Sequence, residues 1–322
     1  MSLKEFISKE GKEEIYSFYQ KIQACPKDYE KITRNEIYHE IITCYQNDPE
    51  WILKLCNMEE IHILKKLLDG PILKNENGYI DYLLMKDLQD NYLILLENGE
   101  YYIPDDLINY IKMAINLLDE KKYSISDVTD SVILGIVRVN NVLSFDTFIH
   151  VFNTYCREEQ ILDLKKYIKL NPKFRQKIEI IRYQKVDYIV SREYYYFKEV
   201  LKLRTSFQVK EYSLEEIISF GKYKLNLFQE NILYFLNFLE VHLNSKSIDL
   251  LIDDLAFYSG FHMQDDVMLL EICDHIEELY NEVKKVISYF PDWIYTDEIQ
   301  EKEDEKEGFF LKVKKVWSKL FK

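Results

Sequence analysis

The stretch VILGIVRVNNVLSFDTFIHVF, from Val132 to Phe152, decides the fold of the middle of this chain. Apolar residues recur at helical spacing on either side of the polar pair at positions 140–141, which predicts a helix, a short break and a second helix. Ser144 can cap the second helix. Two structures share this pattern: the helix-turn-helix of a nucleic-acid-binding protein, and one corner of a helical core.

The composition of the whole chain favours helices. Its 322 residues are enough for two or three domains, and 47% hydrophobic with 30% charged residues is ordinary for a globular protein. Only 8 glycines and 6 prolines are available for turns, fewer than sandwiches and barrels need. A net charge of -14 argues against a surface built everywhere to bind phosphate, but it leaves room for one basic face.

The cysteines and the start of the chain predict a cytoplasmic protein. The five cysteines are widely spaced and form no CxxC pair, so we expect reduced thiols rather than a zinc ribbon or a redox motif. The opening residues, MSLKEFISKEGKEE, carry charges throughout and predict no signal peptide. No apolar run approaches the ~20 residues that a membrane span requires.

The predicted elements follow a similar order twice. The first module, residues 57–122, begins with helices at MEEIHILKKLLDG and YIDYLLMKDLQD, continues with a hairpin around the turn ENGE, and ends with a helix. The second module, residues 123–210, begins with a helix that Ser126 can cap. Two more helices follow, and then a hairpin that turns at Gln184-Lys185. Three helices followed by a hairpin is the element order of a winged helix.

We therefore predict a mainly α fold with small β-hairpins, in which two winged-helix-like modules lie between helical N- and C-terminal regions. Within the C-terminal domain, residues 265–290 form the longest predicted helix. The expected parts are an N-terminal helical region at 1–56, the modules at 57–122 and 123–210, a C-terminal helical domain at 211–296, and an acidic linker with a basic tail helix at 297–322.

The second module carries the clearest charge asymmetry. Residues 160–210 hold thirteen Lys and Arg against five Asp and Glu, although the chain as a whole is acidic. In a winged helix the third helix enters the major groove and the hairpin touches the backbone, so basic side chains there suit phosphate contact. Against this, the helix has no row of Asn, Gln or Arg suited to base contacts, and a charge run is usually a solvated face. The candidates for phosphate contact are Lys165, Lys166, Lys169, Lys173, Arg175, Arg182 and Lys185.

No enzyme motif is present in the sequence. A Gly-rich phosphate loop, GxSxG, HExxH and a zinc cluster are all missing, so we expect neither an enzyme nor a cofactor. We predict no catalytic residues; the candidates for metal ligands are His262, Asp266, Glu271 and His275, of which the last two share one face of the predicted helix. Such a group could bind a divalent metal, but charged residues on a helix more often form a solvated face.

The last fifteen residues predict a basic amphipathic helix, with lysines largely opposite one apolar stripe. This helix could dock on the acidic body of its own chain, bind in a groove of a partner protein, or lie on an anionic membrane. The membrane comes last, because about four turns bind a membrane weakly on their own. The stripe consists of Phe309, Val313, Val316, Trp317, Leu320 and Phe321.

Three segments carry a resemblance to known proteins: VILGIVRVNNVLSFDTFIHVFNTY, EYSLEEIISFG and LYNEVKKVISYFPDWIYTDEI. Through them, residues 120–300 resemble a loosely defined group of proteins from low-GC Gram-positive bacteria (Firmicutes) and their mobile elements, many of which end in a SEC-C zinc motif. The resemblance implies a recurring helix-loop-helix but no established activity. Here a Lys/Phe/Trp helix stands in place of the Cys-rich tail, so no metal-dependent role of that tail is carried over.

Three hypotheses of function follow. The leading one is a non-catalytic regulatory or adaptor protein that binds another macromolecule, first of all a protein, through its winged-helix-like modules and its tail. The alternative is a DNA-binding transcriptional regulator that uses the second module. The third is a metal-dependent hydrolase centred on residues 262–275.

Overall fold

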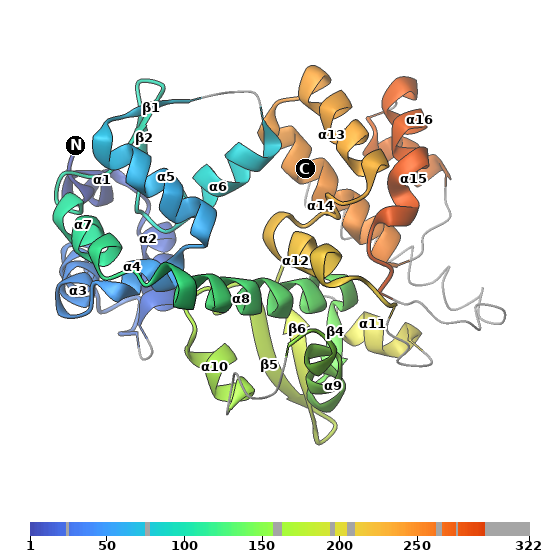
Figure 1. Cartoon of the computed structure of the whole chain (residues 1–322), viewed down its shortest axis with the longest axis horizontal. Coiled ribbons are helices and arrows are strands. Elements are labelled where there is room, and N and C mark those ends of the chain that lie inside the picture. The colour runs from blue at the N-terminus through green and yellow to red at the C-terminus, as the bar shows by residue number, and fades with distance from the viewer. Residues whose placement is uncertain are drawn as a thin grey trace.

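A long central helix, α8 (Glu120–Asn140), organises the molecule. Figure 1 shows α8 crossing the middle, with the N-terminal elements to its left, the C-terminal helices above it to the right, and the second sheet below it. The described chain is mainly helical with two three-stranded antiparallel sheets, which confirms the predicted fold class. The computed structural model describes residues 1–23, 26–74, 78–156, 163–193, 197–204, 210–261, 266–274 and 276–293.

The N-terminal elements share one apolar core. A buried cluster runs from Leu3 in the first helix to Ala114 in the last, so the boundary predicted between residues 56 and 57 falls inside it. A small sheet with strand order β1-β3-β2 packs among these helices. The elements are α1 (Leu3–Lys9), α2 (Lys12–Ile22), α3 (Arg34–Asn47), α4 (Glu50–Leu55), α5 (Met58–Asp69), β1 (Ile72–Leu73), α6 (Tyr79–Asp90), β2 (Leu95–Glu97), β3 (Glu100–Tyr102) and α7 (Ile108–Asn116).

Local sequence signals fix several of these boundaries. Ser2, Thr33 and Asn57 each begin a helix with a capping box, in which a glutamate three residues later bonds back to the cap. The predicted hairpin is confirmed: β2 and β3 pair on either side of Asn98 and Gly99. Both turn residues have positive φ, 53° and 81°, which is the conformation that Asn-Gly pairs favour.

The second sheet contains a strand that the sequence pattern did not reveal. The predicted break after α8 includes β4, whose Val142 pairs with Val190, and the strand order is β4-β6-β5. A three-residue strand is too short to show an alternating pattern. The first helix of this module also starts earlier than predicted, because Asp119 caps it and Ser126 lies within it. The remaining elements are β4 (Val142–Ser144), α9 (Phe145–Tyr155), α10 (Leu164–Leu170), β5 (Ile178–Tyr183), β6 (Val186–Ser191) and α11 (Phe197–Leu203).

Helix α8 packs tightly against α12 (Leu214–Tyr223) because each helix presents a glycine at the crossing. A Cβ on Gly135 would lie 2.0 Å from the Ile217 carbonyl oxygen, and one on Gly221 would lie 1.9 Å from the Ser131 carbonyl oxygen. Both distances are far below van der Waals contact, so only glycine allows this approach. The helix that opens the predicted C-terminal domain therefore shares the core of the second module.

A buried arginine strengthens the same crossing. Arg138 donates two hydrogen bonds to Glu193, at 2.8 and 2.7 Å, and also donates to the carbonyl oxygens of Phe220 and Gly221. It thus binds two carbonyl oxygens in the last turn of α12, of which that of Phe220 also accepts from the Lys224 backbone N–H at 3.1 Å. The Arg138 guanidinium holds the pKa of Glu193 down to about 2, although burial alone would raise it.

The C-terminal helices form a third core. The helix predicted over residues 265–290 is instead divided, because the backbone turns at Asp274 with φ of 53°. At the end of the described chain, Trp293 is fully buried and donates from its indole N–H to the Arg138 carbonyl oxygen, at 3.1 Å. No helix in this part or in the rest of the described chain is both long and apolar enough to cross a membrane. The elements are α13 (Glu230–His242), α14 (Ser245–Gly260), α15 (Asp266–Ile272), α16 (Glu277–Val286) and the 3₁₀ helix η2 (Ile287–Tyr289).

Candidate nucleic-acid interface and an ionic cavity

Four of the seven predicted phosphate-binding residues lie on an exposed surface, which we call the α10–hairpin face. Lys166 and Lys169 are exposed on α10, and Arg182 and Lys185 are exposed on the β5–β6 hairpin. Within the described residues none of the four forms an ion pair. Figure 1 shows α10 and the hairpin together below α8, on the side away from the C-terminal helices.

Local contacts hold α10 and the hairpin together. Asp163 caps α10 by accepting a hydrogen bond from the Lys166 backbone N–H, at 2.8 Å. The neighbouring Lys165 forms an ion pair with Asp187 on β6, and the hydrogen bond from Lys165 lowers the pKa of Asp187. Lys165 therefore positions the helix against the hairpin rather than facing solvent freely.

The hairpin turns through two residues with positive φ, Gln184 at 48° and Lys185 at 70°. Neither is a glycine, so the turn is strained relative to an Asn-Gly turn. It places the Lys185 side chain at the tip.

The other two predicted residues point into the protein. Arg175 donates to the Lys21 carbonyl oxygen at 2.8 Å and lies 6.0 Å from the centre of the Trp51 ring. Lys173 forms ion pairs with Asp130 at 3.0 Å and with Asp127 at 3.7 Å. Some of the basic residues in 160–210 therefore bind groups in other regions of the chain instead of facing solvent.

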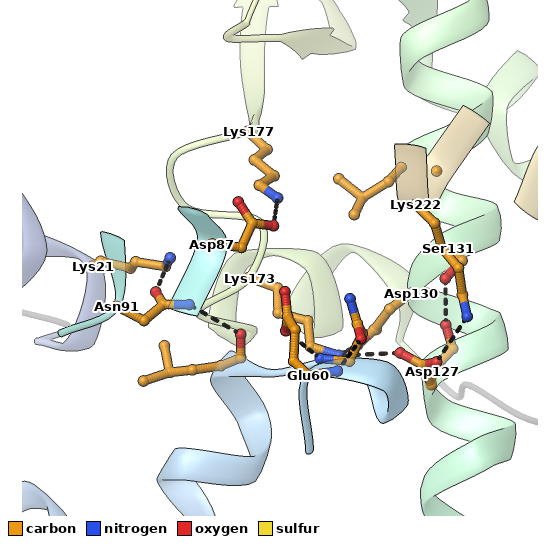
Figure 2. Close-up of a pocket in the computed structure, with 14 residues that line it drawn as sticks. Lys21, Glu60, Asp87, Asn91, Asp127, Asp130, Ser131, Lys173, Lys177 and Lys222 are labelled. Atoms are coloured by element: carbon orange, nitrogen blue, oxygen red, sulfur yellow. Dashed lines mark hydrogen bonds and ion pairs between the residues drawn. The ribbon is translucent and has the colours of Figure 1, made fainter. Parts of the chain in front are cut away.

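Lys173 lines an ionic cavity where the N-terminal region, α8 and α12 meet. The cavity measures about 40 Å³, enough for about three waters. Figure 2 shows Lys177 meeting Asp87 on one side and Lys173 reaching toward Asp127 and Asp130 on the other. The charged residues that line it are Lys21, Lys173, Lys177 and Lys222, and Glu60, Asp87, Asp127 and Asp130.

Ion pairs across the cavity join elements that are far apart in sequence. Lys177, just before β5, lies 3.1 Å from Asp87 on α6. Lys222 on α12 lies 3.6 Å from Asp127 on α8 and 3.0 Å from Glu59 on α5. Lys177 thus links the segment before β5 to the N-terminal region, and Lys222 links α12 both to α8 and to the N-terminal region.

Two members of the cavity titrate far from their ordinary range. Burial lowers the pKa of Lys21 to about 8. Burial, together with the negative charge of Asp87, raises the pKa of Glu60 to about 8. At pH 7 Glu60 is therefore mostly neutral while Lys21 is mostly charged. For Lys173, burial acts to lower the pKa, but the charges of Asp130 and Asp127 outweigh it and hold the pKa well above its usual value.

Sequence patterns did not identify this cavity. One signal was present: Asp127 and Asp130 stand one turn apart, next to the apolar run of α8, at positions that are buried in the structure. Their partner Lys173 lies more than forty residues away, so no local pattern pairs them.

Two of the four metal candidates, Asp266 and Glu271, lie within the described residues. Helix α15 ends at Ile272, one residue after Glu271. Asp266 forms an ion pair with Lys284 at 3.2 Å, and Glu271 is exposed. No three His, Cys, Asp or Glu within the described ranges could hold a metal ion. His262 and His275 lie outside those ranges.

The predicted tail stripe also lies outside the described residues, which end at Trp293. No family model matches this chain, and no curated protein or solved structure is significantly similar to it. The resemblance to Firmicute proteins with SEC-C tails therefore stays a prediction.

Proposed function

We propose that this chain is a regulatory protein that binds nucleic acid through the α10–hairpin face. The observation that carries the proposal is the set of four exposed cations on that face, which have no ion-pair partner among the described residues. The helix-strand-helix-helix-hairpin order and the strand order β4-β6-β5 also support it, because a winged helix has the same order. In that fold the third helix, here α10, enters the major groove.

The chemistry of the face favours phosphate over bases. Lysine ammonium groups act as point charges toward phosphate, whereas sequence is read mainly by bidentate side chains such as Arg, Asn and Gln. Arg182 is the one arginine among the four and lies on the hairpin, not on α10. We therefore expect binding that depends on salt and only weakly on sequence.

The test is fluorescence anisotropy with a labelled random-sequence duplex at 50 and 200 mM salt. Four phosphate contacts predict that affinity falls about 100-fold between the two salt concentrations. Replacing all four cations of the face by Gln should abolish binding at 200 mM and most of its salt dependence. The matched control changes the net charge equally, by replacing four exposed lysines elsewhere with Gln: Lys112, Lys121, Lys122 and Lys246.

Two results would overturn the proposal. One is no binding by the unchanged protein at 50 mM salt. The other is an equal loss of affinity in the face variant and the control, since that would make net charge alone responsible.

An adaptor that binds an acidic protein through the same face is the second candidate. Leu170 at the end of α10 is 53% exposed, and Val186 on β6 is 40% exposed. Exposed apolar side chains beside lysines suit a protein surface better than a phosphate backbone. Replacing Leu170 by Ser and Val186 by Thr should leave duplex affinity within twofold but weaken such a partner at least tenfold.

A further inference from the structure

Helix α13 buries one face in the C-terminal core and leaves an apolar face exposed. Leu233, Tyr234 and Val241 on this helix are 45%, 68% and 79% exposed, and Phe228 just before it is 62% exposed. Tyr234 and Val241 are seven residues apart and share one helical face. Single exposed apolar residues are common, but four within fourteen residues form a patch that calls for a partner. We call it the α13 outer face.

The C-terminal region that carries this face is strongly acidic. Residues 211–293 hold sixteen Asp and Glu against five Lys. Helix α16 packs beside α13 and exposes Glu277 and Glu278. A partner that combines an apolar stripe with positive charge would match this surface.

The chain itself contains such a partner. Residues 308–322 hold five lysines and no Asp or Glu, and six of their apolar residues, from Phe309 to Phe321, fall on one helical stripe. As a helix, these fifteen residues would be about 22 Å long, close to the roughly 20 Å of the thirteen residues of α13.

We infer that the α13 outer face is the docking site for the chain's own C-terminal segment, residues 308–322. The apolar stripe of the segment covers Tyr234 and Val241, and its lysines lie toward Glu277 and Glu278. The fourteen residues between Trp293 and the segment can span up to about 45 Å, so the tether allows the contact. A tether of this length also gives the segment an effective concentration on the order of millimolar, so even a weak contact is populated.

This inference does not depend on the proposed function. It predicts that the segment competes with outside partners, since it occupies a surface that is otherwise apolar and exposed.

Photo-crosslinking in the intact chain tests the inference. Trp317 is replaced by p-benzoylphenylalanine, the protein is irradiated, and the crosslinked peptides are mapped by mass spectrometry. The expected product is a monomer in which position 317 is joined to residues 228–242. The double variant Tyr234→Glu with Val241→Glu should reduce its yield at least fivefold, because it removes the apolar surface and adds like charge to an acidic region.

The matched control is Leu117→Glu, which changes a residue that is 55% exposed at the end of α7. It should leave the yield within twofold, and the melting temperatures of all three proteins should agree, because every changed residue is exposed.

Four results would overturn the inference: crosslinks to another region, crosslinks between two chains, no crosslinks, or an equal loss of yield in the control. Adding anionic vesicles separates docking from membrane binding. If crosslinks to residues 228–242 vanish and the protein sediments with the vesicles at physiological salt, the segment belongs to the membrane and the inference is wrong.

Discussion

Replacing Lys173 by Met should destabilise the protein by about 3 kcal/mol, because it leaves buried charge without its counter-charge. The Lys173 side chain is only 12% exposed, and the carboxylates of Asp127 and Asp130 are 6% exposed. Removing one partner of a buried ion pair costs about 3–5 kcal/mol. The lower end applies here because Asp130 keeps hydrogen bonds from Tyr167 at 2.6 Å and from Asn171 at 3.0 Å.

The measurement is thermal unfolding, in which a loss of about 3 kcal/mol corresponds to a melting temperature roughly 6–12 °C lower. Lys169→Met removes the same charge from exposed α10 and should change the melting temperature by less than about 2 °C. Adding Asp127→Asn and Asp130→Asn to Lys173→Met should restore most of the loss, because the buried charges are then removed together. Equal effects of Lys173→Met and Lys169→Met on the melting temperature would refute the conclusion that the buried ion pairs of Lys173 stabilise the fold.

Three further predictions concern stability. Gly135→Ala should lower stability by about 1–3 kcal/mol, measured by urea unfolding, since the new Cβ meets the Ile217 carbonyl oxygen and α8 must move from α12. Glu193, whose pKa falls from 4.5 to about 2, contributes about 3 kcal/mol to the free energy of unfolding above pH 5, and this contribution is lost as pH falls through 2. Glu193→Gln should therefore flatten the acid unfolding curve over that range. An unchanged curve would contradict the pairing with Arg138. Burial raises the pKa of Glu60 from 4.5 to about 8, so its contribution to stability is complete below pH 4.5 and is lost as pH rises from there to about 8. Glu60→Gln should remove this loss in melting curves recorded from pH 4 to 9.

Elements that depend on local chemistry could be predicted from the sequence. The hairpin at Asn98-Gly99 and the cap at Ser144 follow from side chains within three residues of each other. Strand β4 could not be found in this way, because Val142 becomes extended by pairing with Val190, 48 residues later. The break at Asp274 was missed because a positive φ is uncommon at a residue other than glycine.

The candidate site was predictable only in part, for a related reason. The local excess of Lys and Arg, together with the order of the predicted elements, placed the basic residues on a third helix and a hairpin. Lys166 and Lys169 are indeed exposed on α10. Whether a lysine faces solvent or the interior depends on acids elsewhere in the chain. Lys173 turns inward because Asp127 and Asp130 lie opposite it. Lys177 turns inward because Asp87 lies opposite it.

The glycine crossing of α8 and α12 affects how the protein is made. Gly135 leaves the ribosome 86 residues before Gly221, and at 5–20 residues per second this interval lasts roughly 4–17 seconds. During that time the apolar surface that α12 will cover remains open on the nascent chain. Growth at high temperature or slow synthesis should therefore produce aggregates through α8 rather than through the N-terminal helices, which complete their own core by Ala114.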